Sequence, residues 1–276
     1  MEAVQDILKN QGFSASQIGN SNTLSDADKL EMCRRGERFE ERVYVPPEIK
    51  PGCRCAECGD VGFRFFWYDG YEYAEECECH KAAVSAQAIK KAGVREDQTF
   101  DNFFTYQPFQ QEMMNKAREY ANGGYLTGQW FYIGGQVGCG KTHICTAIVH
   151  DLLKKMVGCK YMMWKDESTK LKAIINDHAA YGKAIEELVK APVLYIDDLF
   201  KTQAGFKPSA ADVSLAFQII NARYQDKKYV TIFSCELPIR TLIEIDEAVG
   251  SRIAERSKAY YLYIAKDIEK NWRLKN

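Results

Sequence analysis

The sequence predicts an α/β fold with a central parallel sheet, preceded by a small cysteine-rich module and a helical N-terminal arm. Three observations support this prediction. A glycine-rich segment lies between an apolar run and a helical pattern, a second apolar run ends in two aspartates, and two cysteine pairs flank an aromatic stretch. Strands that alternate with helices are typical of a parallel sheet covered on both faces. We expect three parts, residues 1–50, 51–93 and 94–276.

The composition is that of an ordinary globular chain. Its 276 residues suit one large domain and a smaller one, with 46% hydrophobic and 27% charged residues. No uninterrupted apolar stretch approaches the ~20 residues that span a bilayer, and the N-terminus lacks the basic start of a signal peptide. We therefore expect a cytoplasmic location and no membrane partner. The net charge of −1 gives no global signal for nucleic acid, so any DNA contact must come from a local patch.

The N-terminal arm, residues 1–50, has too few apolar residues to form a core alone. Val4, Ile7 and Leu8 have the spacing of a short amphipathic helix, and the charged segment 27–42 is predicted to be a second helix. Two prolines at positions 46 and 47 then end any helix. Two interpretations of the arm remain open, a solvated tail or a docking segment for a partner protein.

Half of the ten cysteines fall in one short window, a distribution that favours metal binding in a reducing cytosol. The first pair has the spacing of a zinc knuckle, and the second follows about twenty residues later, as in a zinc ribbon. The aromatic segment between the pairs, centred on Asp69 and Gly70, predicts a β-hairpin that brings them together. The predicted zinc ligands are Cys55, Cys58, Cys77 and Cys79. Four thiolates leave no open position on the metal, so the site is structural; Cys53 and His80 are the substitute ligands.

The glycine-rich segment 135–142 fits the phosphate-loop pattern, in which Gly and four free positions precede Gly-Lys-Thr. The run 129–133 before it predicts a buried strand, and residues 142–156 after it have helical spacing. In such a loop the backbone N–H groups surround a phosphate chain, and the positive end of the helix dipole points at the same charge. We expect Lys141 to contact the β- and γ-phosphates and Thr142 to bind magnesium. The predicted nucleotide-binding residues here are Gly135, Gln136, Val137, Gly138, Cys139, Gly140, Lys141, Thr142 and His143.

A wholly apolar run, residues 192–196, ends at Asp197 and Asp198. A strand that is buried on both faces and delivers carboxylates at its C-terminal end is typical of nucleotide sites in open α/β sheets. We expect Asp197 to hold magnesium, directly or through water, and Asp198 to orient or deprotonate the attacking water. Further strands are predicted at 160–164 and 229–233, and further helices at 81–91, 107–121, 166–188 and 211–224.

Taken together, residues 53–276 resemble the AAA+ ATPases, and more narrowly the bacterial and phage helicase loaders of the DnaC/DnaI type with their relative IstB. The resemblance rests on an ordered set of motifs: the cysteine pairs, Thr99-Phe100-Asp101-Asn102-Phe103, the phosphate loop, Ile196-Asp197-Asp198-Leu199, Phe233-Ser234-Cys235-Glu236-Leu237, and the segment from Gly250 to Arg256. It implies an ATPase that uses ATP and Mg²⁺. Asp198 stands where many members have glutamate, which implies slow turnover stimulated by oligomerisation or DNA.

The resemblance implies further site residues. Ser234 stands at the position of the first sensor, which contacts the γ-phosphate or its water. Arg252 lies in the motif that supplies an arginine finger to the neighbouring subunit, where such a finger stabilises the charge of the transferring phosphoryl group. Arg273 stands where a second sensor residue would bind the nucleotide. A finger given in trans needs adjacent subunits, so self-association is expected.

The resemblance also implies partners in replication initiation. The N-terminal region with its zinc module would bind the hexameric replicative DNA helicase, and the ATPase domain would bind single-stranded DNA. Two lysine groups are candidates for a groove that follows the DNA backbone, with Trp164 or Tyr260 as the stacking surface. The first group is Lys165, Lys170 and Lys172, and the second is Lys258, Lys266, Lys270 and Lys275.

Three other functions remain open. A transposition helper ATPase of the IstB type shares the motor but partners a transposase; the zinc module and the charged arm favour the loader. A small-molecule P-loop kinase would need a substrate pocket and a lid arginine cluster, which residues 201–227 do not clearly supply. An interaction adaptor would bind ATP with only marginal hydrolysis.

Overall fold

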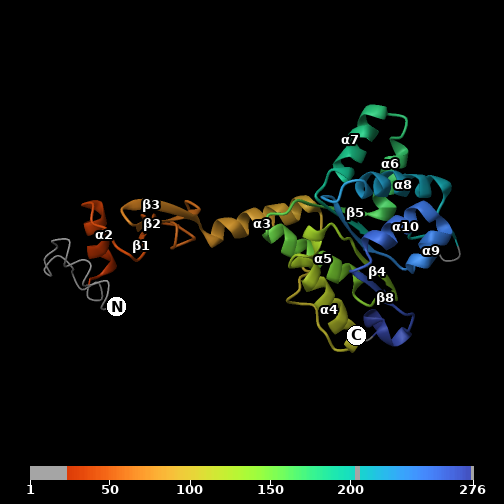
Figure 1. Ribbon diagram of the computed structural model, residues 1–276, viewed down its shortest axis with the longest axis horizontal. Helices are drawn as coiled ribbons and strands as arrows, with labels where there is room; N and C mark the ends of the chain where they lie inside the picture. Colours follow the sequence, from red (N-terminus) through yellow and green to blue (C-terminus); the bar gives the residue numbers. More distant parts are fainter. Residues whose placement is uncertain (1–23, 203–205, 275–276) are drawn as a thin grey trace, which may run out of the picture. The chain divides into compact units, whose positions relative to one another are not determined.

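The computed structural model describes residues 24–202 and 206–274. The chain divides into two compact units, residues 1–83 and 84–276 (Figure 1). Helix α3, Glu78–Ala92, contains the boundary between them. The domain limits expected at residues 50 and 93 stay predictions, and the amphipathic helix expected around Val4 lies outside the described residues. Within the described ranges, no helix is long and apolar enough to cross a membrane.

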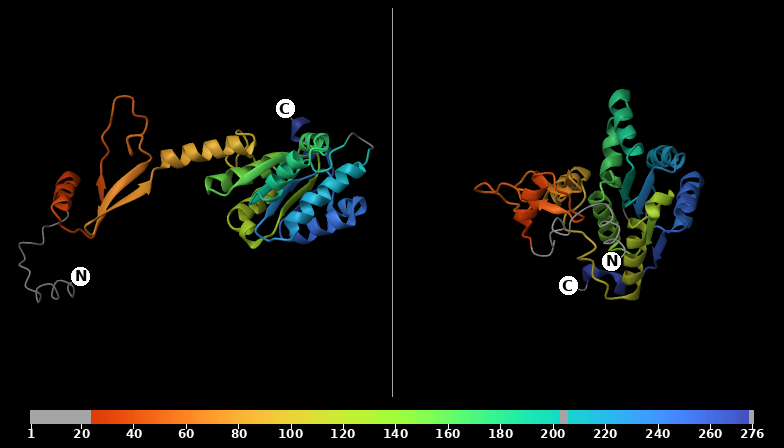
Figure 2. Two further views of the ribbon diagram at one scale, coloured as in Figure 1. Left: turned by 90° about the horizontal axis from the view of Figure 1, so that it is seen from above. Right: turned by 60° about the vertical axis from the view of Figure 1, so that its left-hand side comes forward.

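The small unit is built on an antiparallel sheet in the order β1-β2-β3. Its elements before α3 are α2 (Asp26–Arg34), β1 (Val43–Val45), β2 (Phe63–Tyr68) and β3 (Tyr71–Glu76). Tyr68 pairs with Tyr71 across a turn at Asp69 and Gly70, and both turn residues have positive φ, as tight hairpin turns require. The predicted hairpin is therefore confirmed, and Figure 2 shows β3 leading directly into α3.

Helix α2 is shorter than the sequence pattern predicts. Ser25 and Asp28 form a capping box at its start. The helix ends before Gly36, whose φ of 89° is a left-handed conformation that stops a helix. The predicted continuation to Arg42 is therefore wrong, and the chain instead forms β1, which pairs with β2. A small core joins α2 to the sheet, and its buried members are Leu30, Cys33 and Val43.

The large unit contains a sheet in the order β5-β6-β7-β4-β8, in which every neighbouring pair is parallel. Its strands are β4 (Phe131–Gly135), β5 (Cys159–Met163), β6 (Val193–Asp197), β7 (Val230–Ser234) and β8 (Tyr261–Ile264). Its helices after α3 are α4 (Pro108–Ala121), α5 (Lys141–Lys154), α6 (Trp164–Ala173), α7 (His178–Val189), α8 (Ala210–Tyr224), α9 (Ile239–Ile245) and α10 (Glu247–Arg256). Short 3₁₀ turns are η1 (Gly124–Thr127), η2 (Ile268–Lys270) and η3 (Trp272–Leu274). Strands β4 and β5 lie between α5 on one side and α8 and α10 on the other (Figure 1), so the predicted α/β fold is confirmed.

Two details of the large unit differ from the prediction. A single helix was expected over 166–188, but the structure has two helices, α6 and α7. The chain leaves the helical conformation after α6, and a new helix begins directly after its N-cap residue, Asp177. The Asp177 carboxylate caps α7 by accepting a hydrogen bond from the N–H of Ala180 at 3.0 Å. Strand β8 was not predicted; it lies at the sheet edge, and only every second residue of it is buried.

The register of the parallel strands brings chain-distant segments to one edge of the sheet. Ile133 of β4 is opposite Ser234, and Ile196 of β6 is opposite Phe233. All residues of β4, β6 and β7 are buried, which explains their continuous apolar sequences. The loop after β4 and the acids at the end of β6 therefore share the carboxyl edge, where ligands of such sheets bind.

Arg223 of α8 ties this helix to the strands beneath it. Its side chain is fully buried, and its Nε donates to Thr231 Oγ1 on β7 at 3.0 Å. Its Nη1 donates to three carbonyl oxygens at 2.8 to 2.9 Å, those of Leu188, Val189 and Ala191. Leu188 and Val189 are the last two residues of α7, and Ala191 follows the helix, so one guanidinium joins α7, α8 and β7.

We predict that Arg223→Leu lowers the free energy of unfolding by about 3 kcal/mol or more. Several buried carbonyl groups lose their donor, and each unsatisfied buried polar group costs about 1–3 kcal/mol. Thermal and urea unfolding followed by circular dichroism measure the change. The control is the exposed Lys183, for which substitution by alanine should change stability by less than about 0.5 kcal/mol. An unchanged midpoint for Arg223→Leu would contradict this structural role.

Candidate functional site

The loop between β4 and α5 is the centre of the candidate site. It begins at Gly135, where φ is 105° and an added Cβ would lie 1.9 Å from the carbonyl oxygen of Ile264 on β8. It ends at Gly140, the N-cap of α5, where φ is 98°. Only glycine adopts these two conformations at low cost. At Gly135, β8 also leaves no space for a side chain. The loop therefore delivers the N-terminus of α5 to the carboxyl edge of the sheet, a favourable place for an anion.

Lys141 and Thr142 begin α5. Lys141 is only 7% exposed, and its Nζ donates to the carbonyl oxygens of Gly135 and Gln136 at 2.9 and 2.6 Å. Thr142 Oγ1 donates to Oδ1 of Asp197 at 3.2 Å. A largely buried ammonium whose hydrogen-bond acceptors are neutral carbonyls is well suited to bind an anion. The two side chains expected to contact phosphate and magnesium therefore lie next to each other.

A cleft of about 280 Å³ opens over this loop. Its lining residues are Gln98, Asn102, Phe103, Phe104, Gln110, residues 137–143, Asp198, Lys201, Glu236, Trp272 and Arg273. Three of them, Lys141, Lys201 and Arg273, are cationic, and Lys201 is paired with Glu236. Cationic side chains in a cleft at a helix N-terminus favour a ligand with several negative charges.

Asp197 ends β6 and is only 2% exposed. Four hydroxyl groups donate to its carboxylate. Oδ1 accepts from Thr142, from Tyr195 at 2.8 Å and from Ser234, and Oδ2 accepts from Tyr161 at 3.0 Å. A buried carboxylate without such donors would pay several kcal/mol in lost hydration. The four hydroxyl groups therefore offset this cost and fix the orientation of the carboxylate.

Asp198 follows Asp197 and lines the cleft. Its φ of 54° is a conformation that few residues other than glycine adopt, and such strain is concentrated at functional sites. Its N–H donates to Ser234 Oγ at 3.1 Å, while Ser234 itself donates to Asp197. Ser234 is fully buried. Its hydroxyl group therefore connects the two acids inside the protein. Burial, together with the charge of Asp197, raises the pKa of Asp198, which suits a carboxylate that accepts a proton.

The segment before α4 forms an apolar wall of the cleft. The ring of Phe103 meets the edge of His143, with ring centroids 5.2 Å apart, and also touches the loop at Gly140, where an added Cβ would lie 2.8 Å away. His143 Nε2 donates to the carbonyl oxygen of Thr99 at 2.9 Å. Burial lowers the pKa of His143, which favours the neutral ring. His143 therefore holds this wall against α5.

The two arginines expected in the site lie in different places. Arg273 lines the cleft. Arg252 lies on α10, with its guanidinium carbon 5.5 Å from the ring centre of Phe217 and 5.4 Å from that of Tyr224. Arg252 Nη1 donates to the carbonyl oxygen of Ala248 at 2.8 Å, and its Nε has no hydrogen-bond partner among the described residues. The structure therefore brings Arg273 to the nucleotide-binding loop and leaves Arg252 outside the cleft.

The surface considered for DNA differs from the expectation. Trp164 and Tyr260 are only 2% and 7% exposed, and each packs edge-on against another buried ring, so neither is an open stacking surface. Lys170 and Lys172 form ion pairs with nearby carboxylates at 2.6 and 2.7 Å. Lys275 lies outside the described residues. The stacking part of the prediction is wrong because both rings belong to the core.

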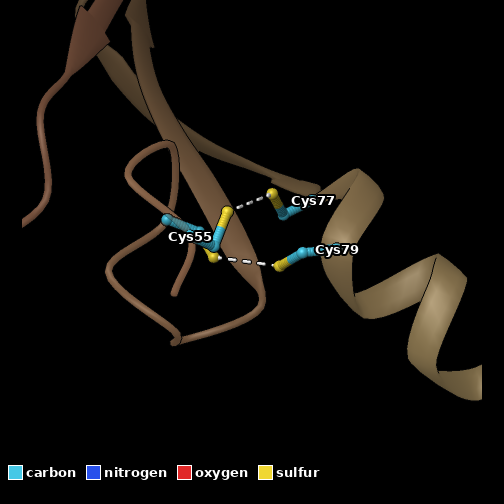
Figure 3. A group of neighbouring side chains, drawn as sticks. Cys55, Cys77 and Cys79 are labelled. Carbon is cyan, nitrogen blue, oxygen red and sulfur yellow. Dashed lines mark hydrogen bonds between the residues drawn. The ribbon is translucent and has the colours of Figure 1, made fainter. Parts of the chain in front are cut away.

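The four predicted cysteines come together at the small unit, between the loop before β2 and the start of α3 (Figure 3). Their sulfur atoms lie within 4.8 Å of one another, with 3.7 Å between Cys55 and Cys77 and 3.3 Å between Cys58 and Cys79. Zn–S bonds of about 2.3 Å in a tetrahedron would place the sulfurs about 3.8 Å apart. Both the donor set and the spacing therefore fit one zinc ion.

The backbone around the knuckle supports this arrangement. The Asp60 carboxylate accepts hydrogen bonds from the N–H groups of Arg54 and Cys55, the latter at 2.9 Å. The N–H of Gly62 donates to Cys58 Sγ at 3.4 Å. An N–H donor favours the thiolate, which is the form that binds metal. The loop is therefore shaped by contacts that a metal site needs in its surroundings.

The two substitute ligands have other partners. Cys53 Sγ donates to the carbonyl oxygen of Cys55 at 3.1 Å, and His80 Nδ1 lies 2.8 Å from a carboxylate oxygen of Glu76. Neither belongs to the four-cysteine group. The Cys-x-Cys pair reaches the cluster because Cys77 directly follows β3 and Cys79 lies in the first turn of α3.

Sequence reasoning missed several parts of the cleft. The hydroxyl groups of Tyr161 and Tyr195 were not predicted to contact Asp197. A signal for Tyr195 was present, because it lies two positions before Asp197 in a strand and so faces the same side. Asn102 and Phe103 were noted only as part of a family motif, and Trp272 only as the neighbour of Arg273. These residues line the cleft beside the loop but lie far from it in the sequence. No local sequence pattern identifies such residues.

Comparison with known proteins gives related chains. The bacterial DnaA ATPase domain family matches residues 94–256. The chain is 34% identical over 223 residues to the uncharacterized protein YqaM of Bacillus subtilis strain 168, covering 75% of this chain and 68% of YqaM. It is 38% identical over 133 residues to the phage-like element PBSX protein XkdC of the same strain, covering 47% of this chain and 48% of XkdC. It is 28% identical over 159 residues to the chromosomal replication initiator protein DnaA of Cereibacter sphaeroides, covering 56% of this chain but only 33% of DnaA.

Solved structures share the fold of the large unit. The DnaC helicase loader has a TM-score of 0.52 and 23% identity, covering 61% of this chain and 97% of that chain. The replication initiator DnaA bound to AMPPCP and single-stranded DNA has a TM-score of 0.53 and 17% identity, covering 63% of this chain and 51% of that chain. At these identities the likeness concerns the fold alone, and it confirms the predicted AAA+ architecture.

We predict about one zinc ion per purified chain, measured by inductively coupled plasma mass spectrometry. Cys58→Ser should lose most of this zinc, because the thiolate is one of four ligands and the metal stabilises the loop that supplies it. The matched control is Cys53→Ser, which removes a neighbouring thiol outside the cluster and should keep the metal. Equal zinc content in the two variants would contradict the assignment of the four ligands.

Proposed function

Because the chain belongs to the bacterial DnaA ATPase domain family, we propose that it is an ATP-dependent loader that binds the hexameric replicative DNA helicase and single-stranded DNA during replication initiation. The family match over residues 94–256 includes the glycine-rich loop, both acids and Arg252. Membership implies that the large unit binds and hydrolyses ATP. The helicase, the DNA and self-association are the further steps of the proposal.

The observation that carries the ATPase assignment is the meeting of the loop and the two acids at one edge of the sheet. Lys141 exchanges its carbonyl partners for the β- and γ-phosphates. Thr142 and Asp197 are the residues that would hold Mg²⁺, which neutralises charge on the phosphates when bound. Their adjacent oxygen atoms, 3.2 Å apart, fit such an ion. Asp198 orients the attacking water and accepts its proton.

Other residues of the cleft complete the nucleotide site. Phe103 and the neighbouring segment offer a flat apolar wall that suits a purine base, and His143 holds that wall in place. Arg273 adds a positive charge on the rim, where it would contact the phosphates. Ser234 contributes by holding Asp197 and Asp198 in register, since it contacts both.

Arg252 supports a working form with more than one subunit. It lies outside the cleft of its own chain, and its side chain is partly exposed on α10. A guanidinium in this state can reach the phosphates bound by a neighbouring copy. There it would stabilise the charge of the transferring phosphoryl group.

Two features favour a loader over an initiator of the DnaA kind. The DnaC helicase loader is covered over 97% of its length, whereas the DnaA structure is covered over 51%. This chain also carries a separate small unit with a four-cysteine cluster, which offers a docking surface for a partner protein. We assign the helicase contact to this unit. Binding of single-stranded DNA is assigned to the large unit, by analogy with the DNA-bound DnaA structure.

We predict that two inactive variants regain ATP hydrolysis when they are mixed. Lys141→Ala cannot bind phosphate but keeps its arginine, and Arg252→Ala keeps its cleft but gives no finger. In a mixed assembly, the cleft of an Arg252→Ala subunit receives Arg252 from a Lys141→Ala neighbour. Phosphate release by the mixture should exceed the sum of the separate variants severalfold, at protein concentrations that support assembly.

The same experiment separates the alternatives. Without recovery on mixing, the arginine does not act in trans. If Lys141→Ala hydrolyses ATP as fast as the unsubstituted chain, the cleft is not the ATPase site. An adaptor would show marginal hydrolysis in every sample and would keep its partner binding in Lys141→Ala.

We predict a stoichiometric complex with the replicative helicase of the source organism, with a composition that differs between ATP and ADP. Size-exclusion chromatography with light scattering measures the mass of the complex in each nucleotide. Cys58→Ser should weaken the complex, because it loosens the docking unit, whereas Cys53→Ser should not. If no complex forms with either ATP or ADP, the proposed loader function is wrong, and a transposition helper of the IstB type is favoured.

A further inference from the structure

We propose that Tyr161 is a positioning residue for the magnesium-binding carboxylate of Asp197, and that its hydroxyl group sets the Mg²⁺ requirement of the cleft. The inference rests on the nucleotide function proposed above. It concerns a residue on β5, the strand that pairs with β6.

The sheet register places this hydroxyl group. Tyr161 on β5 and Tyr195 on β6 are directly opposite each other, and their ring centroids are 5.3 Å apart. Asp197 follows Tyr195 by two positions and so faces the same side of the sheet. Tyr195 donates to Oδ1 at 2.8 Å, and Tyr161 donates to Oδ2 at 3.0 Å. The two rings therefore hold the two oxygen atoms of one carboxylate.

The two oxygen atoms differ in how strongly they are held. Oδ1 accepts from Tyr195, Thr142 and Ser234. Oδ2 accepts from Tyr161 alone among the hydrogen bonds of the described residues. Loss of the Tyr161 hydroxyl group would leave Oδ2 without a donor, and the planar carboxylate, held through Oδ1 alone, could turn more freely about its bond to Cβ. Tyr161 is therefore the single donor that fixes the second oxygen.

A carboxylate that is oriented less firmly changes the metal site without changing the phosphate site. Hydrogen bonds to a metal-binding carboxylate fix its direction, and their removal usually costs about 10- to 100-fold in metal affinity or activity. Lys141 and the loop N–H groups do not contact Tyr161, so nucleotide binding without metal should be unaffected. The expected signature is a raised metal requirement with unchanged affinity for metal-free nucleotide.

The test is Tyr161→Phe, which removes one oxygen atom and keeps the ring. In the ADP-bound protein, the dissociation constant of Mn²⁺, followed by electron paramagnetic resonance, should rise about tenfold. The Mg²⁺ concentration for half-maximal ATP hydrolysis should rise by a similar factor. The affinity for a fluorescent ADP analogue in EDTA should stay within about twofold of the unsubstituted chain.

The matched control is Tyr181→Phe, which makes the same change outside the cleft. Tyr181 donates to Gln218 Oε1 at 2.6 Å, between α7 and α8. The proposal is overturned if Tyr161→Phe binds Mn²⁺ as tightly as the unsubstituted chain, or if both variants weaken Mn²⁺ binding equally. It is also overturned if nucleotide affinity in EDTA falls as much as Mn²⁺ affinity. Failure of the unsubstituted chain to bind ADP would instead overturn the proposed function, and this inference with it.

Discussion

The parallel alignment of β4, β6 and β7 is the constraint on which the rest of the cleft depends. Parallel strands cannot be joined by short turns, so their ends come from distant parts of the chain. The register nevertheless places Gly135, Asp197 and Ser234 at one edge. Burial on both faces makes this register costly to change, because a shift of one residue would turn every side chain to the other face. The strand register that keeps the sheet stable is therefore the same register that places these residues in the site.

Within this frame, two opposite charges are kept apart and held by neutral groups. Lys141 is bound by backbone carbonyls, and Asp197 by hydroxyl groups. Neither uses the other as an ion-pair partner, which would make both unavailable to a ligand. A phosphate and a divalent cation can then replace the weaker neutral contacts with full opposite charges. The cleft is thus arranged for a ligand that brings both signs of charge.

The fold could be predicted where local pattern and tertiary context agree. Phosphate-loop glycines, the buried strands and the hairpin turn at Asp69 and Gly70 each have a local physical signature. The break between α6 and α7 and the edge strand β8 were missed because an amphipathic pattern can continue across a short break, and an edge strand has only half of an apolar pattern. Trp164 and Tyr260 show the same limit, since residue type alone does not distinguish a core ring from an exposed one. The four-cysteine group was predictable because its spacing is itself the requirement of the metal.

The turn η3 contacts the glycine-rich loop between β4 and α5, although the two lie far apart in the sequence. The N–H of Trp272 donates to the carbonyl oxygen of Gly138 at 2.9 Å, and its ring stacks on Tyr106 with centroids 4.9 Å apart. An added Cβ on Gly138 would lie 1.9 Å from the Asn271 side chain, so the contact is close. The Gly138 peptide cannot reorient without disturbing an indole ring on the rim of the cleft. The optical signal of the Trp272 indole ring should therefore report the conformation of the loop, because a change in the loop alters the surroundings of the ring.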